Sequence, residues 1–290
     1  MSQNSIPPSL MRQLRVGDVV NISIQLYRSN LKLYLRLALF AHLWLLVPLY
    51  GWAKYCTISG LISRLTFNQL LDRTENISSV QSQLNRRLLG FAIAGFFVFL
   101  ACWLGSIVLA YVVTFFIIIV LALFSFVLKA SLVTSFMGLP EVLLGSIILA
   151  IALLLGFWLN SRLWLTELPL ATEPSIKFWT SIKLSLQLTK KSCNYLQGII
   201  LIVFSLALPI TVIVWLGIGY AISFMVYILP KYAIPNSAAS LLFLIVASLV
   251  AGIMTMPFWQ SAKAVAYYEL RCRQEGLDLK LSNLPRIYQV

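Results

Sequence analysis

The longest stretch of this 290-residue chain without Asp, Glu, Lys or Arg is Leu88–Leu128, which contains 41 residues. A helix rises about 1.5 Å per residue, so this stretch would extend roughly 60 Å, about twice the thickness of the hydrocarbon core of a bilayer. It must therefore bend, re-enter or cross a membrane twice. Four more long stretches also lack these charged residues: Leu37–Ala53, Val142–Ser161, Ser192–Pro230 and Tyr232–Ala262.

The composition excludes a water-soluble single domain. Hydrophobic residues make up 60% of the chain and charged residues 11%, whereas soluble domains contain about 45–50% apolar and about 25% charged residues. We predict an all-α fold, namely a polytopic helical membrane protein with about six spans, amphipathic surface helices and a re-entrant segment. The predicted organisation is a polar N-terminal tail over residues 1–17, a single helical membrane domain over 18–270 and a basic C-terminal tail over 271–290.

The net charge of +13 is concentrated in a few places, because all but two of the 22 Lys and Arg residues lie in four sections. These sections are residues 1–36, 54–87, 162–197 and 263–290, with net charges of +4, +3, +3 and +2. Lys and Arg are enriched in the cytoplasmic segments of membrane proteins. We therefore expect all four sections, and both termini, to face the cytoplasm from a multi-pass position in a plasma or inner membrane.

Sections on the same side of a membrane must be joined by an even number of crossings. Between the first two sections we predict two short crossings or a re-entrant hairpin that turns around Pro48–Lys54, with a weakly hydrophobic second limb. Three apolar pieces lie between the second and third sections, but an even number of crossings allows only two of them to cross the membrane. The third piece should be re-entrant, lie at the membrane interface or continue one of the other two. Between the last two sections, Gly198–Met225 and Ala239–Gln260 are predicted as a pair of spans.

An amphipathic helix lying in the headgroup plane is predicted over residues 175–191, with Ser175 as its N-cap. A weaker version is predicted over Val16–Lys32. The candidate lipid-facing basic residues are Lys177, Lys183, Lys190, Lys191, Arg86 and Arg87. Each Lys or Arg near a membrane surface attracts anionic lipid by about 1 kcal/mol before screening. Ordinary inside-facing anchors would explain the same residues.

The sequence contains no nucleophile elbow, zinc-binding HExxH helix, P-loop or complete dinucleotide-binding fingerprint. We therefore expect no catalytic residues, no cofactor and no metal site, and no binding of nucleic acid, since topology accounts for the basic charge. The candidate polar residues within the membrane are His42 and Lys129, with a structural role as the alternative. Glu167 and Glu173 are expected to form local salt bridges near Arg162.

Two phrases recur along the chain. Ile22–Arg28 resembles Leu184–Lys190, and the spacing of Pro48 and Lys54 resembles that of Pro257 and Lys263. The pattern favours a degenerate duplication, although short apolar phrases also recur by chance. Internal repeats are common in transporters.

A second feature bears on transport. Pro209 lies within an apolar stretch, where it is expected to kink the helix, and Gly217 and Gly219 are expected to loosen or break it further. Together with the repeat, these residues raise the alternative of a small transporter or channel.

Two segments resemble a known group of proteins. The first contains Leu168, Pro169, Leu170, Glu173, Pro174, Ser175, Leu186, Gln187, Leu188, Thr189 and Lys190. The second contains Tyr267, Tyr268, Glu269, Leu270, Arg271, Cys272, Arg273, Glu275 and Gly276. Both are similar to uncharacterised bacterial integral membrane proteins grouped with the membrane domain of glycerophosphoryl diester phosphodiesterases. The resemblance implies a helical membrane domain with about six spans and cytoplasmic amphipathic elements, without the catalytic domain, which alone needs about 250 residues.

These observations favour a non-enzymatic integral membrane protein that organises lipids or assists a membrane complex through a basic cytoplasmic face. The expected partners are membrane lipids, anionic on the cytoplasmic face, and a protein partner whose identity the residues do not indicate. The small transporter or channel is the alternative function. An intramembrane enzyme would require a clustered acid and base.

Overall fold

The computed structural model describes residues 14–48, 50–100, 156–228 and 236–275, together with the isolated helical positions 103, 107, 111, 115 and 119. Throughout these residues the regular secondary structure is helical, which confirms the predicted all-α class. The helices are α1 (Val16–Ser29), α2 (Leu31–Trp44), α3 (Tyr50–Leu70), α4 (Ile77–Asn85), α7 (Glu167–Thr172), α8 (Phe178–Thr189), α9 (Cys193–Ile228) and α10 (Asn236–Glu275). Further helices cover Leu88–Leu100 and residues 156–163.

The same local order occurs three times in this part of the chain. A short helix, α1, α4 or α8, directly precedes a more apolar helix, which is α2, Leu88–Leu100 or α9. The chain turns sharply at the second of these junctions, where the two helices meet at 79°. Each short helix therefore marks the entry to an apolar segment.

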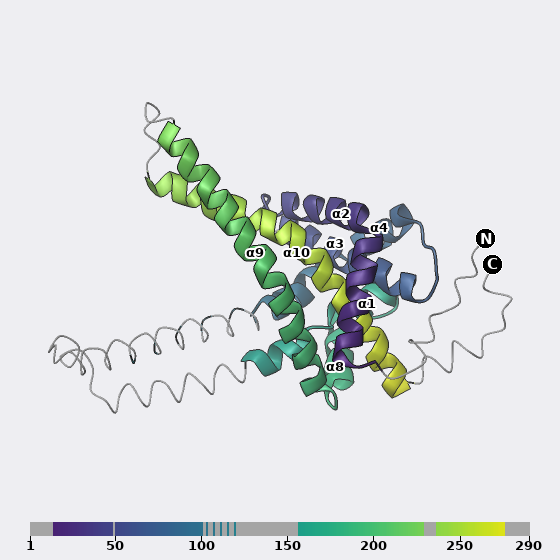
Figure 1. Ribbon diagram of the computed structural model, residues 1–290. Helices are drawn as coiled ribbons and strands as arrows, with labels where there is room; N and C mark the ends of the chain where they lie inside the picture. Colours follow the sequence, from purple (N-terminus) through teal and green to yellow (C-terminus); the bar gives the residue numbers. More distant parts are fainter. Residues whose placement is uncertain are drawn as a thin grey trace.

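Helix α10 is the axis around which most of the other labelled helices pack (Figure 1). Its first half lies beside α9, and its second half contacts α1, α3, α7 and α8. Between Pro257 and Leu270 almost every residue is buried, including the charged Lys263 and Glu269. The largest apolar core of the described residues forms around this half of α10, with side chains from α1, α3, α8 and α9.

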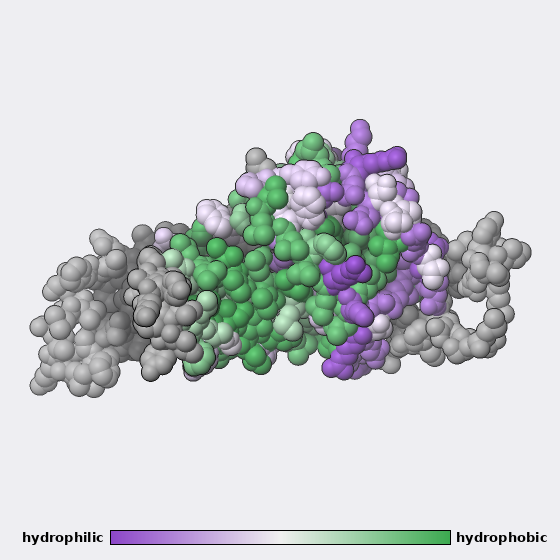
Figure 2. All heavy atoms as spheres, turned by 90° about the horizontal axis from the view of Figure 1, so that it is seen from above, coloured by the Kyte–Doolittle hydropathy of each residue, from purple (hydrophilic) through white to green (hydrophobic). Residues whose placement is uncertain are grey.

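Two helices are long and apolar enough to cross a membrane, over Cys193–Met225 and Ala238–Gln274. The bent pair of α4 and Leu88–Leu100 would add a third candidate span if its two helices acted as one. Large apolar side chains of α9 remain exposed, among them Ile213 at 70% and Phe224 at 64%. Figure 2 shows a broad hydrophobic area beside a hydrophilic border on one face of the molecule. The predicted pair of long apolar helices is thus confirmed.

Helices α2 and α3 form a helical hairpin at the place where the sequence predicts either a re-entrant hairpin or two short crossings. The turn begins at Leu45, and α3 starts at Tyr50, close to the expected turn. Helix α3 packs against α2, α10, α4 and α7 and is buried on most sides. Its buried residues include Ser59, Gly60 and Ser63. Helix α3 has low hydropathy because its side chains face other helices on most sides.

Several details differ from the sequence predictions. Helix α8 begins at Phe178 with Lys177 as its N-cap, because Lys177 has the extended backbone of an N-cap residue (φ −82°, ψ 158°) while Ser175 lies in the preceding turn. Helix α9 continues through Pro209 and through both glycines near its middle, so the predicted break is absent. Apolar residues surround these positions in sequence, and an apolar setting favours keeping backbone groups hydrogen-bonded within the helix.

Candidate functional site

Exposed basic residues occur at all three junctions between a short helix and the apolar helix that follows. Arg28 and Lys32 flank the first junction, Arg86 ends α4, and Lys190 and Lys191 lie between α8 and α9. All of these side chains are exposed, and none forms an ion pair with another residue of the described ranges. The junctions thus present positive charge that no carboxylate of the described residues neutralises.

Five acidic residues of the described ranges are engaged by groups other than the exposed basic residues at the junctions. Asp18 lies in the first turn of α1 and accepts a hydrogen bond from the backbone N–H of Arg15 at 2.9 Å. Four glutamates form ion pairs: Arg64–Glu75 at 2.9 Å, Lys263–Glu167 at 3.2 Å, Arg271–Glu173 at 2.7 Å and Arg273–Glu269 at 2.5 Å. The four glutamates are thus neutralised by basic residues other than the exposed ones at the three junctions.

Helix α8 turns its hydroxyl-bearing face into the protein. Ser181 Oγ donates to the carbonyl oxygen of Thr166, and Ser185 Oγ donates to that of Arg162 at 2.7 Å. These carbonyls lie at or just beyond the end of the helix over residues 156–163, where intrahelical donors run out. Trp179 on α8 is 57% exposed. Helix α8 thus combines buried serines on one side with an exposed aromatic ring on the other.

The predicted basic residues lie in two different settings. The exposed ones are Arg86, Lys177, Lys183, Lys190 and Lys191. Arg87 is half-buried, and its Nη1 donates to the carbonyl oxygens of Leu170 and Glu173 at 2.8 and 3.0 Å. Burial lowers the pKa of Arg87, but a guanidinium keeps its proton in proteins. Lipid contact stays a prediction for the exposed group, whereas Arg87 attaches the second junction to α7.

His42 is buried on α2 and makes contacts of a structural kind. Its Nδ1 lies 2.8 Å from the carbonyl oxygen of Ala38, and its ring meets the ring of Tyr55 edge-on at 5.2 Å between centroids. The ring also fills the space beside Gly252 on α10, where any Cβ would clash with it. The other polar candidate, Lys129, lies outside the described residues.

A buried polar cluster joins α3, α7 and α10. Glu167 Oε2 accepts from Lys263 Nζ at 3.2 Å and from Ser59 Oγ at 3.0 Å. Gln260 Nε2 donates to Ser59 Oγ at 2.5 Å, and Ser63 Oγ donates to Gln260 Oε1 at 2.7 Å. The side chains of Lys263 and Glu167 are each only 8% exposed. The cluster brings an acid and a base together, but its polar atoms are engaged with one another.

Sequence reasoning missed this cluster, because its members lie far apart in the chain. The spacing of its members within each helix could have indicated the cluster. Ser59 and Ser63 are four positions apart, and Gln260 and Lys263 are three apart, so each pair lies on one face of its helix. Two polar faces in otherwise apolar surroundings would be expected to pair.

The expected local salt bridges to Arg162 are wrong for both glutamates. Glu167 pairs with Lys263, and Glu173 pairs with Arg271 at 2.7 Å. The turn over residues 164–166 redirects the chain before α7, and α7 packs against α3 and α10. Arg162 instead donates from Nη2 to the carbonyl oxygen of Leu186 at 2.6 Å. Residues of the two segments that carry the family resemblance thus contact each other at the Glu173–Arg271 pair.

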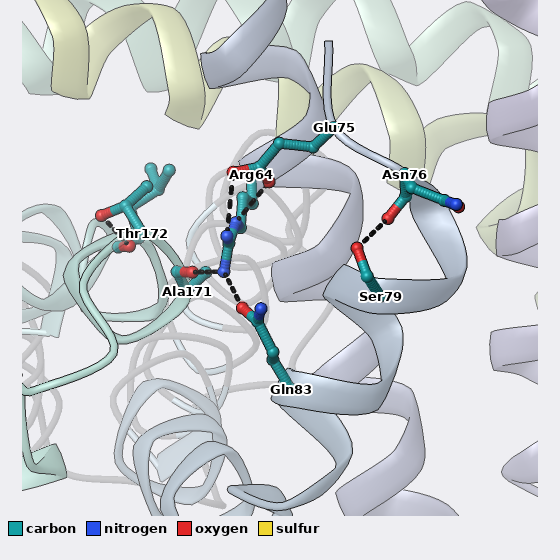
Figure 3. A network of polar contacts seen from close by, with 8 residues as sticks. Arg64, Glu75, Asn76, Ser79, Gln83, Ala171 and Thr172 are labelled. Atoms are coloured by element: carbon teal, nitrogen blue, oxygen red, sulfur yellow. Dashed lines mark hydrogen bonds and ion pairs between the residues drawn. The ribbon is translucent and has the colours of Figure 1, made fainter. Parts of the chain in front are cut away.

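Arg64 connects several elements at one point (Figure 3). Its Nε and Nη2 bind the two carboxylate oxygens of Glu75 at 2.9 and 3.0 Å. Its Nη1 donates to the carbonyl oxygen of Ala171 at 3.0 Å and also lies 3.4 Å from Gln83 Oε1. These bonds tie α3 to the following loop, to α4 and to α7, so they hold the second junction in place.

The described residues contain no group of three or more His, Cys, Asp and Glu side chains that could hold a metal ion. No protein-family model, curated protein or solved structure matches the chain. Functional inference therefore rests on the helices, the basic junctions and the polar contacts themselves.

Proposed function

We propose that this chain is a non-enzymatic integral membrane protein that organises lipids, or assists a membrane complex, through a basic cytoplasmic face. The observation that carries the proposal is the exposed, unneutralised Lys and Arg at the three helix junctions. Phosphates of anionic lipids are the counter-charges that such residues meet at a membrane surface. The proposed partners are anionic lipids and a protein partner that binds at the same face.

The proposed topology follows from helix lengths. Helices α9 and α10 would cross the membrane, whereas the 14 residues of α2 extend about 21 Å and fall short of a core of roughly 30 Å. A re-entrant α2–α3 hairpin, with the two crossings predicted between the second and third basic sections, would give four crossings in total. The predicted total of about six requires both limbs of the hairpin to cross. Both termini would face the cytoplasm from a plasma or inner membrane. The resemblance to the membrane domain of glycerophosphoryl diester phosphodiesterases implies about six spans and so favours a hairpin whose two limbs cross.

The test is lipid enrichment around the protein in polymer-bounded membrane discs taken from vesicles with equal amounts of neutral and anionic lipid. A K183Q/K190Q/K191Q variant removes the exposed positive charge of Lys183 on α8 and those of Lys190 and Lys191 directly after its C-terminal end. Each lysine contributes about 1 kcal/mol before screening, or roughly a fivefold preference, so the variant should lose most of the anionic enrichment at low salt.

The single substitutions K183Q and K54Q form a matched comparison, because both remove one lysine charge. Lys54 Nζ donates to Asn85 Oδ1 at 3.0 Å and lies over the Trp44 ring, so it is engaged with the protein. K183Q should lower anionic enrichment more than K54Q. Wild-type discs without anionic enrichment and without a stoichiometric protein partner would refute the proposal.

A small transporter or channel is the second candidate. The recurring order of short helix and apolar helix favours it, since internal repeats are common in transporters. Its test is solute flux in vesicles that contain His42→Ala or Lys129→Gln protein. Flux equal to that of the wild type would remove these residues from a transport path.

A further inference from the structure

The α2–α3 hairpin exposes an apolar surface along α2 and at its turn. The large apolar side chains exposed there are Leu39, Phe40, Leu43, Trp44, Leu45, Leu46 and Val47. Lys32 and Arg36 precede them on α2 and are also exposed. The exposed side of α2 therefore changes from basic to apolar toward the turn.

The apolar part of this hairpin is short. Trp44 ends α2 eight positions after Arg36, which corresponds to a rise of about 12 Å. The turn follows directly at Leu45. The hydrocarbon of one leaflet is about 15 Å thick, half of a core of roughly 30 Å. The exposed apolar side of α2 thus matches one leaflet and is too short for two.

Lys54 limits the distance between the turn and the second basic junction. Its Nζ donates to Asn85 Oδ1 at 3.0 Å, and Asn85 ends α4 next to the exposed Arg86. The same Nζ lies 5.7 Å from the ring centroids of Trp44 and Tyr50, which flank the turn. A lysine side chain is far shorter than a bilayer is thick. With Arg86 among the headgroups of one leaflet, the turn therefore does not reach the headgroups of the other.

Contacts with α10 place the hairpin near one end of a candidate span. That span begins at Ala238, and a helix of about 20 residues from there, to Phe258, covers a hydrocarbon core. Tyr27, beside the first junction, has its ring 6.3 Å from that of Phe258. His42 fills the space beside Gly252, which lies about 21 Å along α10 from Ala238. Both contacts lie in the half of the span that is farther from Ala238.

We propose that the α2–α3 hairpin inserts into a single leaflet, the one that the basic junctions face, and that the exposed side of α2 binds the acyl chains of that leaflet. Lys32 and Arg36 stay with its headgroup phosphates. Asn85 and two aromatic rings hold the Lys54 ammonium, which lowers the cost of a cation near hydrocarbon. The inference rests on the proposed membrane setting. It selects four crossings over the six that the family resemblance implies, and the hairpin displaces lipid from one leaflet alone.

The experiment is cysteine labelling in sealed vesicles that contain the full-length chain with its four native cysteines replaced by alanine. Single cysteines replace Leu31, Leu46, Ile213 and Ser79, whose side chains are all exposed, so the packed core stays unchanged. An impermeant maleimide should label L31C from the same side as S79C. Labelling of L46C, relative to its labelling in detergent, should be about tenfold lower than that of L31C from either side, because hydrocarbon excludes a polar reagent.

Labelling of L46C from the side opposite to S79C would reveal a crossing hairpin and would overturn the proposal. Labelling of L46C from the same side as S79C, as fast as that of L31C, would also overturn it, because the hairpin would then lie outside the hydrocarbon. Failure of the membrane setting is a separate outcome. It appears as rapid labelling of I213C on the candidate span α9, which should be as slow as that of L46C.

Spin labels at Leu39, Leu43 and Leu46 test the depth within the leaflet. Collisions with oxygen, relative to collisions with a water-soluble nickel chelate, should increase in that order, because oxygen dissolves in hydrocarbon and the chelate does not. A maximum at Leu43 followed by a decrease at Leu46 would contradict insertion into one leaflet. Failure of the basic-face proposal appears instead as absent anionic enrichment in discs, which depends on the lysines at α8 and not on the hairpin.

Discussion

Replacing Glu167 by glutamine should destabilise the protein strongly, although the two side chains have nearly the same shape. The substitution keeps an oxygen that accepts from Ser59 Oγ, which lies 3.0 Å from Glu167 Oε2 in the wild type. It removes the charge that faces Lys263 Nζ at 3.2 Å. Both side chains are 8% exposed, so water does not replace the lost partner. Breaking a buried ion pair in this way costs about 3–5 kcal/mol.

The free energy of unfolding can be measured by titrating denaturant into the protein in mixed micelles while following tryptophan fluorescence. Trp164 and Trp259 lie 6.2 Å apart between ring centroids, on the turn before α7 and on α10, so they report separation of the cluster. E167Q and K263M should each lose about 3 kcal/mol or more. The double variant should lose much less than their sum, because removing both charges leaves neither one buried alone.

Glu75→Gln is the control, because the side chain of Glu75 is 32% exposed and belongs to the Arg64 pair. It should cost about 1 kcal/mol or less, as is usual for ion pairs near the surface. Single E167Q and K263M effects no larger than that of E75Q would refute the reasoning. Strict additivity in the double variant would refute the direct coupling of the two charges.

Two further predictions concern packing and topology. Gly252→Ala should destabilise the same unfolding transition by about 1–3 kcal/mol, because the new Cβ would clash with the His42 ring, and His42→Ala should relieve much of this cost in the double variant. Gly217→Ala, which has no atoms near its added Cβ, should be neutral or stabilising by up to about 1 kcal/mol; an effect equal to that of G252A would contradict the packing argument. In a chain whose own cysteines are replaced by alanine, cysteines at Ser79 and Ala238 should react with an impermeant maleimide from opposite sides of sealed vesicles, and labelling from one side alone would exclude the proposed crossing of α10.

The sequence predicts those parts of the fold that depend on the average character of a segment. Long apolar stretches predict the α9 and α10 helices, and the distribution of charge predicts the α2–α3 hairpin. The same reasoning predicts α3 only as a weakly hydrophobic second limb, because hydropathy measures how well a helix suits lipid. Helix α3 is enclosed by other helices, and Ser59, Ser63 and Thr66 are buried in it. Enclosure by neighbours is a tertiary property that segment averages do not contain.

Partner choice among charges is predicted less well for a related reason. Glu167 and Glu173 lie close to Arg162 in sequence, which favours local pairs, but their partners are Lys263 and Arg271 on α10. The direction in which α7 leaves its turn decides this pairing. By contrast, the exposure of the lysines on α8 agrees with the sequence pattern, since their positions follow from the period of a single helix.

The distribution of polar and apolar side chains supplies the physical argument for a membrane setting. Exposing apolar surface to water costs about 25 cal/mol per Å², yet α9 leaves large residues such as Ile213, at 70% exposure, on its outer surface. In the same molecule α3 buries serines and α8 turns its serines inward. In hydrocarbon, exposed apolar side chains carry no such cost, whereas polar groups without hydrogen-bond partners do. The observed arrangement is therefore one that hydrocarbon favours. Under the proposed function, short helices that end in exposed Lys or Arg at each entry to an apolar helix would fix the depth of the chain in the membrane, because their charges would stay with the headgroups.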